Sequence, residues 1–163
     1  MGALRAGAIG VDFLPVKGIL GSAYPELNPN LKVVPEPFSG EEQVVVRALR
    51  PDVTLVHGAK GDSQGNLLVP RRSDVHLAVK AGRQVIATVE EKVEGELRDE
   101  ADWRLIPPIY ITALVHAPGG AAPTGFPPYY EQDGEHIAAY LKTGKDEAGY
   151  KEYLEKHVFG EGG

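Results

Sequence analysis

The stretch VTLVH at residues 53–57 and the stretch QVIATV at residues 84–89 decide the fold. Both are short, mostly apolar and rich in β-branched residues, which is typical of strands buried on both faces of a sheet. Between them, residues 74–82 repeat apolar side chains at helical spacing and end on Gly82, a residue suited to a helix C-terminus. A strand, a helix and a further strand predict a βαβ unit with a right-handed crossover. We therefore expect an α/β fold with a mostly parallel sheet and flanking helices.

The rest of the chain extends this pattern in short elements separated by glycine and proline. Further strands are expected at residues 8–11, 13–16, 32–34, 43–49, 67–69 and 109–115, loops at 58–66 and 116–128, and helices at 129–141 and 146–158. No repeat and no linker marks a second domain. The chain is expected to be a single α/β domain over residues 1–163, with residues 129–159 as a C-terminal helical segment.

Composition excludes several classes of protein. The chain has 163 residues, 42% of them hydrophobic and 25% charged, which fits a globular domain rather than a disordered or fibrous one. A net charge of −6 without a basic run disfavours binding to nucleic acid or to an anionic membrane. There is no cysteine, no apolar run long enough to span a bilayer and no signal-peptide pattern, so a cytoplasmic location is expected.

One serine lies in a motif that serine hydrolases use. Residues 61–65 match the pattern G-x-S-x-G, but the chemistry needs a helix directly after the serine, and residues 66–69 have the pattern of a strand. A second arrangement would combine Ser63 with Asp133 and His136, in the manner of some esterases. The alternative, favoured on physical grounds, is that these residues simply form a turn.

Polar side chains follow the expected strands. His57 and His116 each end one, at the place where open α/β sheets bind ligands, although a buried histidine held by the backbone is the simpler interpretation. Glu90 and Glu91 follow the strand at 84–89, and adjacent residues of a strand point to opposite faces. One of these carboxylates could therefore serve a site while the other meets solvent, or both could form a solvated strand end. The spacing of the histidines predicts no metal site.

Five blocks of sequence, taken together and in order, resemble the carboxyl-terminal part of the A subunit of class I CoA-transferases of the glutaconate CoA-transferase type. They are RAGAIGVDFLPVKGILGS at 5–22, EPFSGE at 36–41, RPDV at 50–53 with DSQGN at 62–66, VIATVEEKV at 85–93, and APGGAAP at 117–123 with YYEQD at 129–133. The resemblance implies a fold like that of the CoA-transferase and ribose-5-phosphate-isomerase group.

The resemblance also implies an activity. The family moves CoA between an acyl-CoA and a small carboxylic acid through a glutamyl-CoA thioester, and the attacking glutamate belongs to the B subunit. We therefore expect no catalytic residue in this chain, coenzyme A as a substrate and not a resident cofactor, and the B subunit of the transferase as a partner. The candidates for lining the CoA cleft or the subunit interface are Arg5, Ser22, Asp62, Gly65, Asn66, Glu90, Gly119 and Gly120.

The loop at 58–66 carries the most specific of these expectations. It follows the strand at 53–57, so it should lie at the carboxyl end of that strand, beside the cleft or the interface. Asp62 and Asn66 would hold its turn through side-chain to backbone hydrogen bonds, and Gly65 would take a positive φ.

The resemblance has one departure. Relatives carry a long segment before the block that begins here at Arg5, including a glycine-rich loop near the active site. The chain is then a fragment, a shortened subunit, or a subunit whose first half comes from a separate chain. Two alternative functions stay open: hydrolysis of a CoA thioester on the same scaffold, with ring opening, and a non-catalytic binding domain.

Overall fold

The computed structural model describes residues 1–144 and 146–160. Contacts within the chain divide it into two compact units, Met1–Pro118 and Gly119–Gly163. Because such a division does not show whether the units fold independently, the single domain over residues 1–163 stays a prediction. Among the described residues, no helix combines the length and the apolar character needed to cross a membrane.

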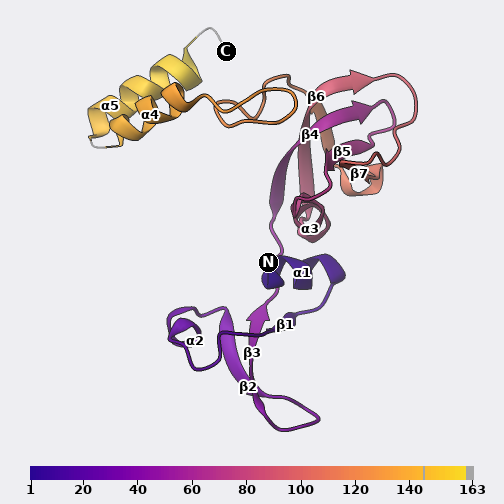
Figure 1. Ribbon diagram of the computed structural model, residues 1–163, viewed down its shortest axis with the longest axis vertical. Coiled ribbons are helices and arrows are strands. Elements are labelled where there is room, and N and C mark those ends of the chain that lie inside the picture. The colour runs from indigo at the N-terminus through magenta and orange to yellow at the C-terminus, as the bar shows by residue number, and fades with distance from the viewer. Residues whose placement is uncertain (145, 161–163) are drawn as a thin grey trace. The chain divides into compact units, whose positions relative to one another are not determined.

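The first unit contains two sheets and three helices (Figure 1). Its elements are α1 (Gly2–Ile9), β1 (Phe13–Val16), α2 (Tyr24–Leu27), β2 (Leu31–Pro35), β3 (Glu42–Arg47), β4 (Val53–Asp62), β5 (Leu67–Pro70), α3 (Val75–Ala81), β6 (Gln84–Val93), β7 (Trp103–Ile106), the 3-10 turn η1 (Pro108–Tyr110) and β8 (Ala113–His116). The expected strand at residues 8–11 is wrong, because most of that segment belongs to α1 or its C-cap.

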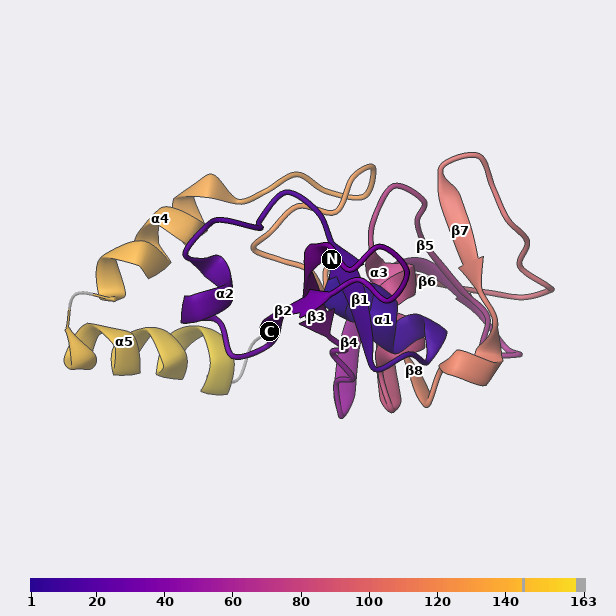
Figure 2. The ribbon, with the colours of Figure 1, turned by 90° about the horizontal axis from the view of Figure 1, so that it is seen from below.

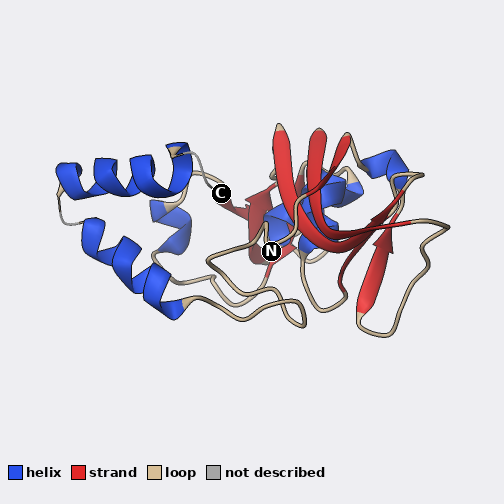
Figure 3. Cartoon of the chain, turned by 90° about the horizontal axis from the view of Figure 1, so that it is seen from above, coloured by secondary structure: helices blue, strands red, loops and turns tan. Residues whose placement is uncertain are grey.

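The expectation of a mostly parallel sheet is wrong. Strands β1, β3 and β2 form a small sheet that is antiparallel throughout. The larger sheet has the order β7-β5-β4-β6-β8 and is mixed, with parallel pairs only between β4 and β6 and between β6 and β8. Figure 3 draws the strands in red and the helices in blue. The cause is the short connection from β4 to β5: a tight turn can reverse the chain but cannot carry it back to start a parallel strand.

Strand β4 is longer than the sequence pattern predicts. The pattern ends the strand at His57, whereas the structure extends it to Asp62. Its glycines are not loop residues but positions of close packing. A Cβ atom on Gly58 would lie 2.4 Å from Leu67 Cδ1, and one on Gly61 would lie 2.5 Å from Leu114 Cδ2. Glycine inside a strand often marks such an approach.

Helix α3 is confirmed between residues 75 and 81, but the role of Gly82 differs from the expectation. Its φ of −72° is not left-handed. A Cβ atom there would lie 2.3 Å from Thr54 Oγ1, so glycine lets the helix end close to β4. Helix α3 also packs against α1, where a Cβ atom on Gly7 would lie 2.2 Å from Leu49 O and 3.2 Å from Ala81 Cβ.

The larger sheet buries one face and leaves apolar side chains on the other. The buried core comprises Leu67, Val69, Val79, Val85, Ala87, Val89 and Ile106. On the opposite face of the parallel strands, Leu55 is 75% exposed, Val115 48% and Ile86 38%. The expectation that residues 53–57 are buried on both faces is therefore wrong.

The second unit ends in two helices that lie side by side, α4 (Gly134–Thr143) and α5 (Glu147–Leu154), the latter continuing into a π-helical turn at Glu155–Phe159 (Figure 2). Each begins at an aspartate whose side chain accepts a backbone hydrogen bond, from His136 N to Asp133 and from Gly149 N to Asp146. The Asp133 cap explains why α4 begins after the expected position.

Candidate functional site

A buried histidine–glutamate pair bridges β4 and β6. His57 Nε2 lies 2.5 Å from Glu90 Oε1, and His57 Nδ1 lies 2.7 Å from Thr88 Oγ1. Glu90 is only 8% exposed. The three side chains thus form a continuous hydrogen-bonded chain across two parallel strands.

Strand register explains why these residues meet. His57 pairs directly with Thr88 in the parallel β4–β6 ladder. Glu90 lies two residues farther along β6, so its side chain leaves the same face of the strand as that of Thr88. On the next strand, His116 pairs with Val89, and its Nε2–H donates to the Glu90 backbone oxygen at 3.1 Å. All of these residues lie toward the carboxyl ends of the parallel strands, the edge where open α/β sheets bind ligands.

A hydrogen bond joins the two side chains of the pair. His57 Nε2 and Glu90 Oε1 both carry lone pairs, so a 2.5 Å contact between them holds a proton, which lies on Nε2 of a neutral imidazole or an imidazolium that faces a carboxylate, or on the carboxyl group of Glu90. This is an assignment from the hydrogen-bond network. A buried acid without such a partner would be costly, and His57 supplies the partner. Glu91, the next residue, is exposed, which confirms that the adjacent carboxylates point to opposite faces.

A second feature of the candidate site is the hydrogen-bonded turn between β4 and β5. Asp62, 2% exposed, accepts hydrogen bonds from the backbone nitrogens of Gln64 and Asn66, from Asn66 Nδ2 and from Leu97 N, at 2.7–3.0 Å. Burial raises the pKa of Asp62, but these hydrogen bonds outweigh burial and hold the pKa below its ordinary value. Gly65 has a φ of +88°. The predicted side-chain to backbone bonds of Asp62 and the positive φ of Gly65 are confirmed, whereas the Asn66 side chain donates to the Asp62 side chain. The turn begins after Asp62 and not at Gly58.

The remaining sequence candidates lie elsewhere. Arg5 is exposed on α1, and Ser22 is exposed in the turn before α2, where its hydroxyl donates to Ile19 O at 2.6 Å. Gly119 and Gly120 belong to the second unit. Among the described residues, no hydrogen bond or ion pair joins Arg5 or Ser22 to the Asp62 side chain. Their part in a cleft or interface stays a prediction.

The serine-hydrolase interpretation finds no support in the local geometry. Strand β5 follows the turn that holds Ser63, so the helix that a nucleophile elbow requires is not there. His136 Nε2 lies 2.7 Å from Tyr153 Oη, and Asp133 accepts from the His136 backbone, not from its ring. Among the described residues, no group of three or more histidine, aspartate or glutamate side chains could hold a metal ion.

Sequence reasoning named Glu90 and noted that His57 and His116 end strands, but it did not connect them. The signal was present in the expected parallel pairing of residues 53–57 with 84–89. Aligning the two strands from their first residues places His57 beside Thr88 and near Glu90.

The family model for Coenzyme A transferase matches residues 1–117. Among characterised proteins, the chain is 33% identical to the A subunit of 3-oxoadipate CoA-transferase of Pseudomonas knackmussii, over 95% of its own length and 55% of that protein. It is 28% identical to the A subunit of glutaconate CoA-transferase of Acidaminococcus fermentans, over 95% of this chain and 54% of that protein. It is 29% identical to the cholesterol ring-cleaving hydrolase IpdA subunit of Mycobacterium tuberculosis, over 96% and 58% of the two chains.

Solved structures show the same relationship. A structure of the decarboxylase AibA/AibB superposes with a TM-score of 0.80 at 34% identity, covering 98% of this chain and 58% of that one. Glutaconate CoA-transferase from Acidaminococcus fermentans superposes with a TM-score of 0.83 at 25% identity, covering 96% and 55%. The chain thus spans somewhat more than half the length of these relatives. It belongs to the Coenzyme A transferase family and is similar to the A subunits of that family.

Proposed function

We propose that this chain is part of the A subunit of a heteromeric CoA-transferase, which moves CoA from an acyl-CoA to a small carboxylic acid. The observation that carries the proposal is the family match over residues 1–117 together with the two CoA-transferase A subunits to which nearly the whole chain aligns. The B subunit of such an enzyme is the proposed partner. Because the chain spans about half of its relatives, a further polypeptide segment equivalent to the rest of the A subunit is proposed as well.

In this proposal the nucleophile is a glutamate of the partner. Its carboxylate attacks the acyl-CoA carbonyl and expels the CoA thiolate, leaving a mixed anhydride. The thiolate then attacks the glutamyl carbonyl, which releases the donor acid and forms the glutamyl-CoA thioester. The acceptor carboxylate repeats these steps in reverse, takes up CoA and regenerates the glutamate.

This chain would supply the support for that chemistry. Hydrogen bonds to the Asp62 carboxylate hold the turn, so it can shape one side of a cleft without reacting. We place the His57–Glu90 pair at the same edge of the sheet as a positioning unit for substrate or for the partner's catalytic loop. Glu90 is not proposed as the nucleophile.

Hydrolysis is a second candidate function, and one observation favours it. The chain is as similar to a ring-cleaving hydrolase subunit as to glutaconate CoA-transferase. In that case water attacks the acyl group and free CoA is released, whereas in the transferase a carboxylic acid takes up the CoA.

A single assay separates these functions. The chain is produced together with its genomic neighbours, and the purified complex is given an acyl-CoA with and without an isotopically labelled carboxylic acid. Transfer predicts labelled acyl-CoA and little free CoA in the absence of acceptor. Free CoA released without acceptor would favour hydrolysis, and loss of carbon dioxide from the substrate would favour decarboxylation. A correctly assembled complex with none of these activities would refute the enzymatic proposal.

A further inference from the structure

The connection between β2 and β3 forms a closed tip that carries an exposed aromatic ring. Phe38 is 96% exposed. Backbone hydrogen bonds close the tip around it, from Glu36 N to Glu41 O at 2.8 Å and from Gly40 N to Glu36 O at 2.9 Å. Gly40 has a φ of +74°, the left-handed conformation that glycine adopts without strain. The ring is therefore held at the end of an ordered hairpin.

The carboxylate of Glu36 fixes the backbone on which the ring stands. Its Oε2 atom accepts hydrogen bonds from Phe38 N at 2.9 Å and from Ser39 N at 2.6 Å, and the Ser39 hydroxyl accepts one from Glu41 N at 3.3 Å. A backbone that is already fixed loses less conformational entropy when a partner buries the ring. Aromatic side chains are also common among the residues that contribute most to the binding energy of an interface. The tip is thus suited to anchor a contact between proteins.

The tip is also acidic. Residues 33–46 contain three glutamates, at positions 36, 41 and 42, and no lysine or arginine. Glu41 and Glu42 are exposed, and no ion pair to either is found among the residues that the structure describes. A surface that receives this tip must combine apolar area for the ring with positive charge for the carboxylates.

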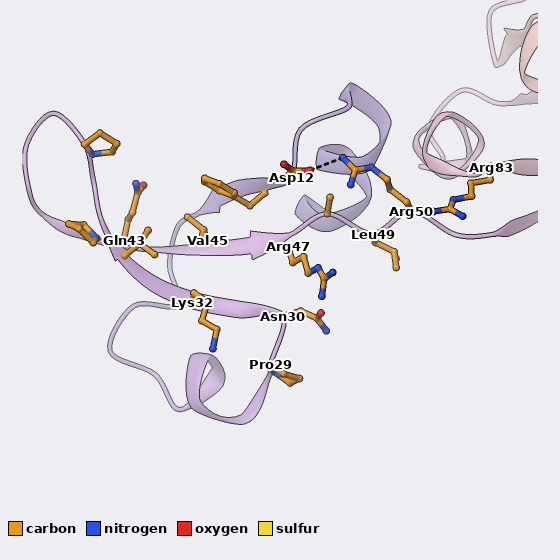
Figure 4. Close-up of a pocket in the computed structure, with 15 residues that line it drawn as sticks. Asp12, Pro29, Asn30, Lys32, Gln43, Val45, Arg47, Leu49, Arg50 and Arg83 are labelled. Atoms are coloured by element: carbon orange, nitrogen blue, oxygen red, sulfur yellow. Dashed lines mark hydrogen bonds and ion pairs between the residues drawn. The ribbon is translucent and has the colours of Figure 1, made fainter.

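One face of the same small sheet has both of these properties. Together with the segment that follows β3, this face lines a groove of about 1030 Å³ (Figure 4). The apolar part of the lining includes Val45, which is 7% exposed, and the ring of Phe13, which is 56% exposed. Against the single carboxylate of Asp12, four cationic side chains line the groove: Lys32, Arg47, Arg50 and Arg83. An excess of positive charge in a concave surface attracts acidic groups.

Two of the four cations are available for a partner. Arg50 and Arg83 each form an ion pair with an aspartate of the chain. Lys32 and Arg47 are exposed, and within the part of the chain that the structure describes neither forms an ion pair. They come from the neighbouring strands β2 and β3 (Figure 4). Their charges match in number the two exposed carboxylates beside the tip.

We propose that two copies of this chain associate through these features, with the acidic tip of each copy in the basic groove of the other. The tip continues the two strands whose face lines its own groove, so it cannot fold back into that groove but can enter the groove of a second copy. A two-fold axis makes the two contacts identical, so each pair of copies buries two Phe38 rings. The proposal stands on the chain alone and does not depend on CoA transfer.

The first test measures self-association of the intact chain by sedimentation equilibrium. The wild type should show a reversible equilibrium between monomer and dimer. Phe38→Ala should weaken dimerisation by at least about tenfold, because each dimer loses two aromatic anchors. Phe159→Ala, at another largely exposed phenylalanine outside the tip, should dimerise as the wild type does. Circular dichroism checks that both variants fold.

The second test exchanges charges between the tip and the groove. Lys32→Glu/Arg47→Glu makes the groove acidic, and Glu41→Lys/Glu42→Lys makes the tip basic. Each variant alone should be monomeric, because like charges then meet in both contacts. An equimolar mixture of the two variants should dimerise, since each groove then meets a tip of opposite charge. Dimers in the mixture also show that both variants are folded.

The matched control for the groove variant is Arg72→Glu/Lys142→Glu, which makes the same change of charge outside the groove and should dimerise as the wild type does. A wild-type chain that stays monomeric, dimers that Phe38→Ala leaves unchanged, or a charge-exchanged mixture that stays monomeric would each overturn the proposal. So would a monomeric wild type that needs the tip and the groove only to bind the B subunit, which would assign both features to that partner. All of these results leave the transferase open, because CoA transfer by the complex is measured separately.

Discussion

Asp62 and Glu90 are both buried acids near the carboxyl ends of neighbouring strands, yet their partners differ. Asp62 accepts hydrogen bonds from one side chain and three backbone groups around a single turn and near Leu97. Glu90 faces an ionisable partner, His57. The first arrangement holds a carboxylate within one turn, whereas the second joins a carboxylate to a side chain of the neighbouring strand. At the residue scale, one acid stabilises the turn and the other links β4 to β6.

Replacing Asp62 should destabilise the chain strongly. Asp62→Ala leaves the amide groups of Gln64, Asn66 and Leu97 without their acceptor, in a buried turn. We expect the free energy of unfolding to fall by about 2–4 kcal/mol in urea titrations, since hydrogen bonds to a charged group carry roughly 1.5–3 kcal/mol each and are not additive. Ser63→Ala, next to it but exposed, should stay within about 0.5 kcal/mol of wild type. Equal effects of the two changes would refute this role for Asp62.

The lowered pKa of Asp62 also predicts how the free energy of unfolding changes at acid pH. The pKa of Asp62 is lowered in the folded state from an ordinary value of 3.8, so the unfolded chain binds the proton more readily. Its contribution is complete above the unfolded pKa and disappears as pH falls from there through the lower folded pKa. Unfolding free energy measured between neutral pH and about pH 3 should therefore decline less in Asp62→Ala than in wild type. Parallel curves for the two proteins would contradict the shift.

Glu90 and His57 should act through position and not as the nucleophile. In the assembled complex, Glu90→Gln and His57→Gln should each reduce kcat by about tenfold or more, because either change disrupts the hydrogen bond that holds the pair in place. Glu91→Gln, at the exposed residue that follows Glu90 in β6, is the matched control. Abolition of thioester formation by Glu90→Gln would instead make Glu90 the nucleophile.

At the scale of elements, the β4–β5 connection determines both the topology of the larger sheet and the position of Asp62 in the candidate site. Its tight turn reverses the chain, makes the sheet mixed and places Asp62 at the strand end. Gly65 takes the left-handed conformation that this turn needs. The element thus links the fold to the candidate cleft.

A side chain at Gly65 should disturb this turn. Gly65→Val forces a β-branched residue into a φ of +88°, with its Cβ atom 3.2 Å from Pro108 Cβ. We expect a loss of about 1–3 kcal/mol in unfolding free energy and a fall in activity of the complex. Gly134→Ala, at a glycine with open space around it and no positive φ, should change little. A Gly65→Val protein as stable and active as wild type would show that the turn tolerates another conformation.

Sequence patterns predicted many of the strands and the β4–β5 turn, but not all of the local structure. Runs of apolar residues predicted β1, β2, β3, β5 and the central parts of β4 and β6. Local turn chemistry predicted the roles of Asp62 and Gly65. Patterns failed where a residue serves tertiary packing. Gly58 and Gly61 indicate a loop in isolation, but they are glycines because Leu67 and Leu114 pack against the strand there. The His57–Glu90 contact needed the register between two strands, which no local pattern contains.

At the scale of the whole molecule, two observations bear on association with a further polypeptide: an exposed apolar face and the greater length of the relatives. Leu55, Ile86 and Val115 lie on the solvent side of the parallel strands. The chain spans little more than half of the A subunits that it matches. Under the proposed function, this face is where the partner or the remainder of the A subunit would pack, because burial of such a patch favours association.

The central claim is that this chain supports a CoA transfer whose covalent step occurs on a partner protein. The most direct test incubates the co-purified complex with acyl-CoA in the absence of acceptor, traps the thioester by borohydride reduction and measures the intact mass of each chain. The account predicts a reduced glutamyl adduct on the partner alone, with this chain unmodified and required for the adduct to form. An adduct on this chain, or an adduct on the partner that forms equally well without it, would contradict the account.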